Sequence, residues 1–325
     1  MGEVLLKVED LQVYYGDKGG WLNKNAKRVV KAVDGISFDV YRGETFGIVG
    51  ESGCGKSTTG KAIIHLINPT GGKIFFGDSQ IDGLTRKDRY NLSKKIQIIF
   101  QDSYSSLDPR FNVGRTIEEP MLVHKMGTPA ERKERVYKLM EDVGLRKDQF
   151  ERYPHEFSGG QRQRIGIARA LSLNPELIVC DEPVSALDVS IQAQILNLMK
   201  NIQKQYNLTY VFISHNLSVV RHICDRIAVM YLGHIVEMAD KKDIFENPKH
   251  PYTKALLGSI PVADPNVPCM EEMLEGDVPS PANPPTGCVF NSRCKYAVEE
   301  CRLKRPELVE CGEGHTAACL RLNEI

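Results

Sequence analysis

Short apolar runs alternate with longer amphipathic segments over the first three-quarters of the chain. The apolar runs are rich in β-branched residues, which predicts strands, and they read TFGIVG, KIQIIF, ELIVCD, TYVFIS and RIAVMYLG. Apolar residues recur at helical spacing in ERKERVYKLMEDVG and QAQILNLMKNIQKQ, which predicts helices. This alternation, from residue 5 to about residue 244, indicates an α/β fold with a mainly parallel sheet covered by helices.

Two stretches depart from this alternation. Between residues 101 and 158 the β runs disappear, so we expect an inserted helical subdomain at about residues 102–165. After residue 244 the chain becomes dense in proline, as in GDVPSPANPPTG, which is typical of a linker that follows a surface. We therefore expect a large domain over residues 1–245, a linker over 246–286 and a cysteine-rich tail over 287–325.

Composition narrows the class of protein. A chain of 325 residues with 42% hydrophobic content can bury a large core and carry an appendage. Its 42 basic residues balance 42 acidic ones, so its charge gives no reason to expect a nucleic-acid partner. The start, MGEVLLKVED, does not resemble a signal peptide, and no apolar run is long enough to span a bilayer. We expect a cytosolic protein whose thiols are reduced.

A phosphate-binding loop stands between an expected strand and an expected helix. GESGCGKST fits the eight-residue pattern of such loops and is followed by the helix-like TTGKAIIHLI. Glycines let backbone N–H groups point at phosphates, Lys56 can reach the β and γ phosphates, and the Ser57 hydroxyl can bind Mg²⁺. The expected ATP-binding residues of this loop are Gly50, Glu51, Ser52, Gly53, Cys54, Gly55, Lys56, Ser57 and Thr58.

LIVCDEP places two carboxylates, Asp181 and Glu182, directly after an apolar strand. Alone, such a pair is more often the start of a solvated loop. Beside a phosphate loop, the simplest interpretation of the pair is that one carboxylate is a metal ligand and the other is a base. We expect Asp181 to hold Mg²⁺ through water and Glu182 to polarise the water that attacks the γ-phosphate.

A second glycine-led helix start occurs in FSGGQRQRIGIARAL, at Ser158, Gly159, Gly160 and Gln161. A helix N-terminus attracts anions, yet one chain needs only one such site per ATP. The surplus site indicates that these residues complete the nucleotide pocket of another subunit. The other interpretation is an ordinary glycine-rich helix start.

Taken in order, these motifs resemble the ATP-binding subunits of ABC transporters, because SALD at residues 185–188 and FISHN around His215 follow FSGGQ and LIVCDEP. The resemblance implies a P-loop NTPase core with an antiparallel β portion near the N-terminus. It implies that Tyr15 stacks on adenine, with Tyr14 as the competing candidate, and that Asp188 belongs to the ATP site. It further implies that Gln101 contacts Mg²⁺ and senses the membrane subunit, and that His215 contacts the γ-phosphate. Without this resemblance, Gln101 would be interpreted as a polar loop residue and His215 as a core histidine.

A narrower resemblance covers nearly the whole chain. FQDSYSSLDPR, EPVSALDVSIQAQILNLM, NPKHPYTKALLGSIP and the cysteine tail are similar to the ATPase subunits of dipeptide and oligopeptide importers, and SGGQRQRIGIARAL resembles the second of their two paired subunits. This implies an ATPase at the cytoplasmic face of the membrane that forms a head-to-tail dimer with a paralogous subunit or itself. The other implied partners are two transmembrane permease subunits and, indirectly, an external peptide-binding protein.

The tail carries the largest group of cysteines, and we expect Cys288, Cys294, Cys301 and Cys319 to bind an iron–sulfur cluster, [4Fe–4S], of structural role. Their spacing contains no C-x-x-C knuckle of the kind zinc sites favour, and the importer ATPases share a similar tail pattern. Zinc is the alternative metal. Cys311 is the alternative ligand, and Cys269 lies too far up the linker.

Two other functions compete with peptide import. A soluble ABC ATPase that acts on nucleic acid or ribosomes would carry two cassettes, long coiled-coil insertions or a basic face, and none is visible in the sequence. An importer ATPase for nickel or another solute would share every motif described, because selection resides largely in other subunits.

Overall fold

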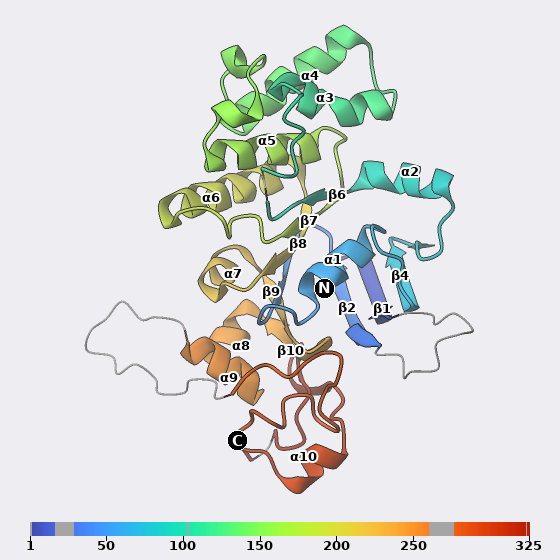
Figure 1. Cartoon of the computed structure of the whole chain (residues 1–325), viewed down its shortest axis with the longest axis vertical. Helices are drawn as coiled ribbons and strands as arrows, with labels where there is room; N and C mark the ends of the chain where they lie inside the picture. The colour runs from blue at the N-terminus through green and yellow to red at the C-terminus, as the bar shows by residue number, and fades with distance from the viewer. Residues whose placement is uncertain (1, 17–28, 103, 260–275, 323) are drawn as a thin grey trace. The chain divides into compact units, whose positions relative to one another are not determined.

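The computed structural model describes residues 2–16, 29–102, 104–259, 276–322 and 324–325 (Figure 1). These form two compact units, one within residues 1–40, 46–83 and 214–325 and the other within residues 41–45 and 84–213. The elements are β1 (Val4–Tyr15), β2 (Val30–Tyr41), β3 (Thr45–Val49), α1 (Lys56–Ile63), β4 (Gly71–Phe76), β5 (Ser79–Gln80), α2 (Arg86–Lys95), β6 (Ile96–Ile99), α3 (Val113–Val123), α4 (Pro129–Asp142), η1 (Lys147–Gln149), η2 (Pro154–Glu156), α5 (Gly159–Leu171), β7 (Leu177–Asp181), α6 (Val189–Tyr206), β8 (Thr209–Ser214), α7 (Leu217–Ile223), β9 (Arg226–Tyr231), β10 (His234–Asp240), α8 (Lys241–Glu246), α9 (Pro251–Gly258), α10 (Glu299–Leu303), β11 (Val309–Gly312) and β12 (His315–Ala317).

The first unit contains two arrays of strands. One is a four-stranded sheet in the order β2-β1-β4-β5, in which β1 and β4 pair antiparallel. This is the antiparallel portion expected near the N-terminus, and the expectation is confirmed. In the other array the neighbours run β11-β12-β10-β9-β3. Only β3 and β9 are parallel there, and β9, β10, β12 and β11 pair antiparallel in turn.

The second unit holds the parallel strands β8-β7-β6 together with helices α2 to α6 (Figure 1). Every residue of β7 and β8 is buried, as expected of parallel strands covered on both faces. α4 begins with a capping box between Thr128 and Glu131 and has Pro129 in its first turn, all signals of a helix start. The α/β class predicted from the apolar periodicity is therefore confirmed.

The segment predicted as a helical subdomain lies in this second unit. Between β6 and β7 the described chain contains helices α3, α4 and α5 and two short 3₁₀ turns, with no strand among its described residues. Apolar residues of α4 at helical spacing, Val136, Leu139 and Met140, are buried, so this subdomain has a packed interior. Its predicted limits, residues 102–165, stay a prediction.

The proline-rich segment contains more regular structure than its composition suggested. α9 lies in the predicted linker, and Pro251 occupies its first turn, where the missing N–H leaves no helical hydrogen bond unmade. The ring of His250 caps this helix by accepting from the Tyr252 N–H at 3.1 Å. Residues 260–275 of the predicted linker lie outside the described residues.

Within the first unit, the tail is joined to β10 by a strand pair and a buried polar contact. β12 pairs antiparallel with β10, with Met238 opposite Thr316. The Glu237 carboxylate is fully buried and accepts from the amide of Lys249 at 2.7 Å and that of His250 at 2.9 Å. It also lies 2.7 Å from His315 Nε2. Within the described ranges, no helix combines the length and the apolar character that crossing a bilayer requires.

Candidate functional site

The phosphate loop leaves β3 and enters α1 through two positions that only glycine can occupy. Gly50 and Gly55 have φ angles of +153° and +106°. A Cβ at Gly50 would lie 2.1 Å from the carbonyl oxygen of Met230, and one at Gly55 would lie 2.2 Å from that of Ala32. Because neither oxygen can move without its strand, the sequence requirement for glycine here is steric.

Lys56, the first residue of α1, points back into this loop. Its side chain is buried, and Nζ donates to the carbonyl oxygens of Gly50 at 2.8 Å and Glu51 at 2.9 Å. Ser57 and Thr58 follow in the first turn of the helix. The positive end of the helix dipole and the lysine cation therefore lie at the same place, which is the arrangement that binds phosphate oxygens.

The two tyrosines that competed for the adenine differ in their surroundings. The Tyr14 hydroxyl donates to Asp34, and Lys31 lies 5.1 Å above the centre of the Tyr14 ring. Burial, followed by the bond to Asp34, raises the pKa of Tyr14 to about 12. Tyr15 is 44% exposed. The Tyr14 side chain is thus engaged within the unit, whereas that of Tyr15 is exposed.

His215 lies in a bend between β8 and α7 and is exposed. The next residue, Asn216, caps α7 by accepting from the amides of Ser218 and Val219 at 2.9 and 3.3 Å. This cap fixes the backbone directly after His215, which itself follows the last residue of β8. His215, Tyr15 and the phosphate loop all belong to the first unit.

In the second unit, Gln101 and Glu182 are in direct contact. Gln101 Nε2 donates to Glu182 Oε2 at 3.0 Å. Glu182 has a φ of +48°, unusual for a residue other than glycine, and its N–H donates to the Ile213 carbonyl at 3.0 Å. Asp181, at the end of β7, is buried. The sequence indicated each of these residues separately but gave no sign that the amide holds the carboxylate.

The FSGGQ motif forms the start of α5. Ser158 caps the helix, with its Oγ accepting from the Gln161 N–H at 3.4 Å, while Gln161 Oε1 accepts from the Ser158 N–H at 3.1 Å. Gly159 and Gly160 are the first two helical residues. As predicted, the motif is a helix N-terminus with its first amides ahead of the hydrogen-bonded turns.

Two of the three arginines of α5 bind carbonyls of their own subdomain. Arg164 donates to the Val143 carbonyl at 2.6 Å, and Arg169 donates to that of Ser106 at 2.5 Å. The third, Arg162, lies near the start of the helix, and its guanidinium is 5.2 Å from the centre of the Tyr104 ring. The groups of this motif that can attract an anion are therefore its backbone amides and Arg162.

Asp188 has a local structural role. Its carboxylate caps α6 by accepting from the Ile191 N–H at 3.0 Å and from the Ser190 hydroxyl at 2.7 Å. These bonds lower the pKa of Asp188. The sequence placed Asp188 in the ATP site through its motif, and the structure shows it as the N-cap of a helix.

Four tail cysteines line one small cavity in the first unit. The cavity has a volume of about 20 Å³, and the thiols around it belong to Cys288, Cys294, Cys301 and Cys319. Cys311 lies elsewhere, on β11, where its Sγ is 3.4 Å from the His315 carbonyl oxygen. The four thiols predicted to act together are thus gathered, and the alternative ligand is separate. Cys269 lies outside the described residues.

These thiols are not arranged around a single ion. Among the described residues, no three His, Cys, Asp or Glu side chains form a group that could hold a metal ion. Burial, the largest effect, raises the pKa of Cys288 to about 11, and neighbouring thiols add to it. Burial likewise raises the pKa values of Cys294 and Cys319. The four sulfur atoms are nevertheless donors of the type that a thiolate-bound group needs.

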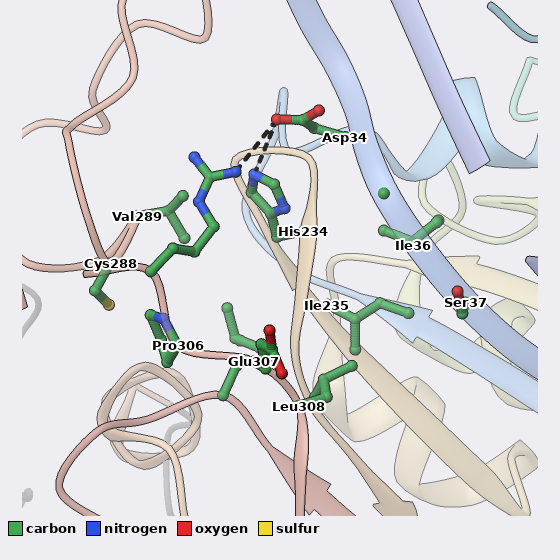
Figure 2. Close-up of a pocket in the computed structure, with 14 residues that line it drawn as sticks. Asp34, Ile36, Ser37, His234, Ile235, Cys288, Val289, Pro306, Glu307 and Leu308 are labelled. Carbon is green, nitrogen blue, oxygen red and sulfur yellow. Dashed lines mark hydrogen bonds and ion pairs between the residues drawn. The ribbon is translucent and has the colours of Figure 1, made fainter. Parts of the chain in front are cut away.

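A larger cavity of about 360 Å³ lies between β2, β10 and the tail (Figure 2). Asp34 lies in it, 3.4 Å from Arg305 Nη1 and 3.5 Å from His234 Nε2. Burial lowers the pKa of His234 to about 4, so this histidine is neutral at pH 7. The remaining wall is largely apolar and includes Val289 and Leu308. The tail therefore forms part of the wall of this cavity and is connected to β2 by the ion pair between Arg305 and Asp34.

Two family models match the chain. The one described as "ABC transporter" matches residues 33–185, and the one described as "Oligopeptide/dipeptide transporter, C-terminal region" matches residues 236–301. The oligopeptide transport ATP-binding protein AppF of Bacillus subtilis is 52% identical over 98% of this chain and 97% of that protein. The chain belongs to the ATP-binding subunits of oligopeptide and dipeptide ABC importers. It is the ATPase subunit of such an import system, and ATP is its nucleotide.

Further relatives agree with this family. The dipeptide transport ATP-binding protein DppF of Haemophilus influenzae is 48% identical over 98% of this chain and 97% of that protein. Among solved structures, a dimeric post-hydrolysis state of the ATP-binding cassette MJ0796 with ADP and Pi covers 73% of this chain and 99% of that one, with 27% identity and a TM-score of 0.64. The cassette cbiO1 of Clostridium perfringens covers 75% and 92%, with 28% identity and a TM-score of 0.66.

The two family models match separate parts of the importer ATPase subunit, and each part contains different motifs. Residues 33–185 include the phosphate loop, Gln101, FSGGQ and the Asp181–Glu182 pair. Residues 236–301 include three of the four gathered cysteines, and Cys319 lies beyond them. The first part of the tail, up to residue 301, thus lies within the region that this family model matches.

Proposed function

We propose that Glu182 is the general base of ATP hydrolysis in this importer subunit and that Gln101 holds its carboxylate in place. The observation that carries the proposal is the 3.0 Å hydrogen bond from Gln101 Nε2 to Glu182 Oε2. A base must be oriented as well as charged, and an amide that donates to one carboxylate oxygen leaves the other to accept a proton from water.

The remaining roles are those implied by the resemblance to ABC ATP-binding subunits. Lys56 binds the β and γ phosphates, His215 contacts the γ-phosphate, and Tyr15 stacks on adenine. The rest of the loop from Gly50 to Thr58 donates backbone amides to the phosphates. The exposure of Tyr15, beside a Tyr14 whose hydroxyl is bonded to Asp34, supports the choice of Tyr15.

Mg²⁺ would be held by Ser57, Gln101 and Asp181, the last through water. Hydroxyl, amide and carboxylate oxygens are the hard ligands that this ion prefers, and the carboxylate of Asp181 is buried at a strand end. The ion supplies positive charge against the phosphate oxygens. We assign it no further part.

Glu182→Gln tests the assignment of the base. The variant should bind ATP with parental affinity and hydrolyse it roughly 10²–10⁴-fold more slowly, because an amide cannot accept the proton. Turnover is measured as phosphate release and affinity with a fluorescent ATP analogue. Glu134→Gln, at an exposed glutamate of α4, is the matched control. Near-parental turnover in Glu182→Gln would show that another group is the base.

Hydrolysis is proposed to power transport through closure of a head-to-tail dimer. ATP on a second ATPase subunit would be contacted by Ser158, Gly159, Gly160 and Gln161 of this chain. We propose that the second subunit is a paralogue, with a second copy of this chain as the alternative. The exposed Ser158 cap of α5 supports this contact, and the MJ0796 cassette is described as a dimer. Asp188 would support this contact indirectly, because it caps α6, the helix that packs against α5.

The other proposed partners are two membrane permease subunits, with an external peptide-binding protein acting through them. The subunit would dock at the cytoplasmic face, with the segment after Gln101 sensing the permease. The balanced charge of 42 basic and 42 acidic residues supports the absence of a nucleic-acid partner. Family membership decides against a soluble ATPase that acts on nucleic acid or ribosomes, and the names of the relatives favour peptides over nickel.

For the tail, we propose that Cys288, Cys294, Cys301 and Cys319 bind a [4Fe–4S] cluster of structural role. Four thiols around one cavity provide the donor set that such a cluster needs. The spacing of these cysteines contains no C-x-x-C knuckle of the kind that structural zinc sites favour. This supports the cluster over zinc.

Anaerobic purification of the full chain tests this proposal. We expect brown protein with about four irons and four sulfides per chain. Cys294→Ser should bleach it, and Cys311→Ser should leave its colour, because Cys311 lies outside the cavity lining. Colourless protein that carries one zinc would contradict the cluster, and bleaching by Cys311→Ser would contradict the choice of ligands.

A further inference from the structure

The phosphate loop is held from the C-terminal part of the chain at one residue, Glu51. The Glu51 N–H donates to the Tyr252 hydroxyl at 2.9 Å. Its carboxylate accepts two bonds from Arg293, from Nη1 to Oε2 at 2.7 Å and from Nη2 to Oε1 at 3.3 Å. Backbone and side chain of the same loop residue are therefore fixed by two residues that lie more than 200 positions later in the sequence.

The holding residues are themselves rigidly placed. The Arg293 side chain is only 5% exposed, and its guanidinium lies 5.9 Å from the centre of the Tyr231 ring. Tyr231 packs against Tyr252 with ring centroids 4.7 Å apart, and Phe290 packs against both at 5.3 and 5.4 Å. A planar, two-pronged arginine that is buried against aromatic rings loses little further freedom when it binds a carboxylate.

This contact continues into the loop and into the tail. On the loop side, the Glu51 carbonyl oxygen accepts from Lys56 Nζ at 2.9 Å. Glu51, whose carboxylate binds Arg293, therefore also positions the lysine. On the tail side, the Arg293 N–H donates to the Phe290 carbonyl at 3.1 Å, and the next residue is Cys294. One turn of the tail thus carries both the arginine and a cavity-lining thiol.

We infer that Arg293 and Tyr252 are positioning residues of the ATP site. Tyr252 fixes the backbone of Glu51, and Arg293 neutralises a carboxylate that stands in the phosphate loop. Without Arg293, that carboxylate would repel the phosphates of ATP at short range, where charge interactions in a partly buried site are strong. The inference rests on the proposal that the Lys56 loop binds the phosphates of ATP.

The test compares nucleotide affinity in variants of the full chain. Arg293→Ala should raise the Kd for a fluorescent ATP analogue, and the KM for ATP, by about tenfold through uncompensated like charge, with kcat little changed. Adding Glu51→Gln to Arg293→Ala should recover most of the affinity, because the repelling charge is gone. Arg302→Ala, at an exposed arginine of the same tail, is the matched control and should bind as the parent does.

Further variants separate positioning from folding. Tyr252→Phe keeps the buried ring and removes only the acceptor of the Glu51 N–H, so it should weaken binding a few-fold at parental melting temperature. Arg293→Lys should fall between parent and Arg293→Ala. Parental affinity in folded Arg293→Ala, or a loss that Glu51→Gln does not repair, would overturn the inference. Lys56→Ala must lose ATP binding in the same assay; if it binds normally, the phosphate-loop proposal itself fails.

Discussion

At the scale of single residues, the catalytic assignments depend on polar side chains that constrain one another. Glu182 is held by Gln101, and Lys56 by the carbonyls of its own loop. Both arrangements place a charge before any substrate contact is made, so less reorganisation remains for the reaction. Histidines that are buried and neutral have a different effect, because they make the free energy of unfolding depend on pH.

The stability of the first unit should fall on acidification. Burial lowers the pKa values of His234 and His250 to about 4, and His250 Nδ1 accepts the Tyr252 N–H, which requires it unprotonated. Because these folded-state values lie below the ordinary 6.5, the stabilisation is fully present above pH 6.5 and is lost as pH falls toward 4. Between those limits each histidine should lower the free energy of unfolding by about 1.4 kcal/mol per pH unit.

Denaturant titrations at pH 7, 6 and 5 measure this slope. His250→Asn, which can still cap α9, should reduce the pH slope by about one proton. The exposed His155, replaced in the same way, should leave the slope as it is. An unchanged slope in His250→Asn would mean that the buried ring is protonated in the folded protein.

At the scale of elements, the start of α5 determines which variants can test dimer closure. A Cβ on Gly160 would lie 2.5 Å from Ile191 Cγ2 of α6, so any substitution there disturbs helix packing as well as a nucleotide contact. Ser158 is exposed, and among the described residues its side chain bonds only to the start of its own helix, where it is the N-cap. Aspartate caps helices about as well as serine, which makes Ser158 the position where charge can be changed and the fold kept.

At the scale of the whole molecule, the tail is in contact with the strands and the phosphate loop of the first unit. It pairs with β10 through β12, contacts Asp34 of β2 through Arg305, and reaches the phosphate loop through Arg293. If Arg293 positions the loop as inferred, a cysteine-rich extension influences nucleotide binding without any catalytic residue of its own. The family model for the C-terminal region covers residues 236–301 and so includes Arg293.

The sequence predicts what local patterns determine. Apolar periodicity identified the buried strands, glycine and lysine spacing identified the loop, and the resemblance to the importer tail pattern favoured the four gathered thiols over Cys311. It did not predict the bonds from Gln101 to Glu182 or from Arg293 to Glu51, because these join residues 81 and 242 positions apart. α9 was missed because proline density suggested a linker, whereas Pro251 sits in the one turn of a helix where proline costs nothing.

The central claim is that this subunit hydrolyses ATP in a closed dimer in which its FSGGQ motif faces the nucleotide of its partner. ATP turnover of the complex purified with its native partners tests it, in the parent, in Ser158→Asp and in Ser158→Asn. The aspartate should keep the α5 cap but repel the partner's γ-phosphate, so turnover and ATP-dependent association should be lost while this chain's own ATP affinity stays parental. Neutral asparagine should retain more of both. Parental turnover and closure in Ser158→Asp would contradict the account.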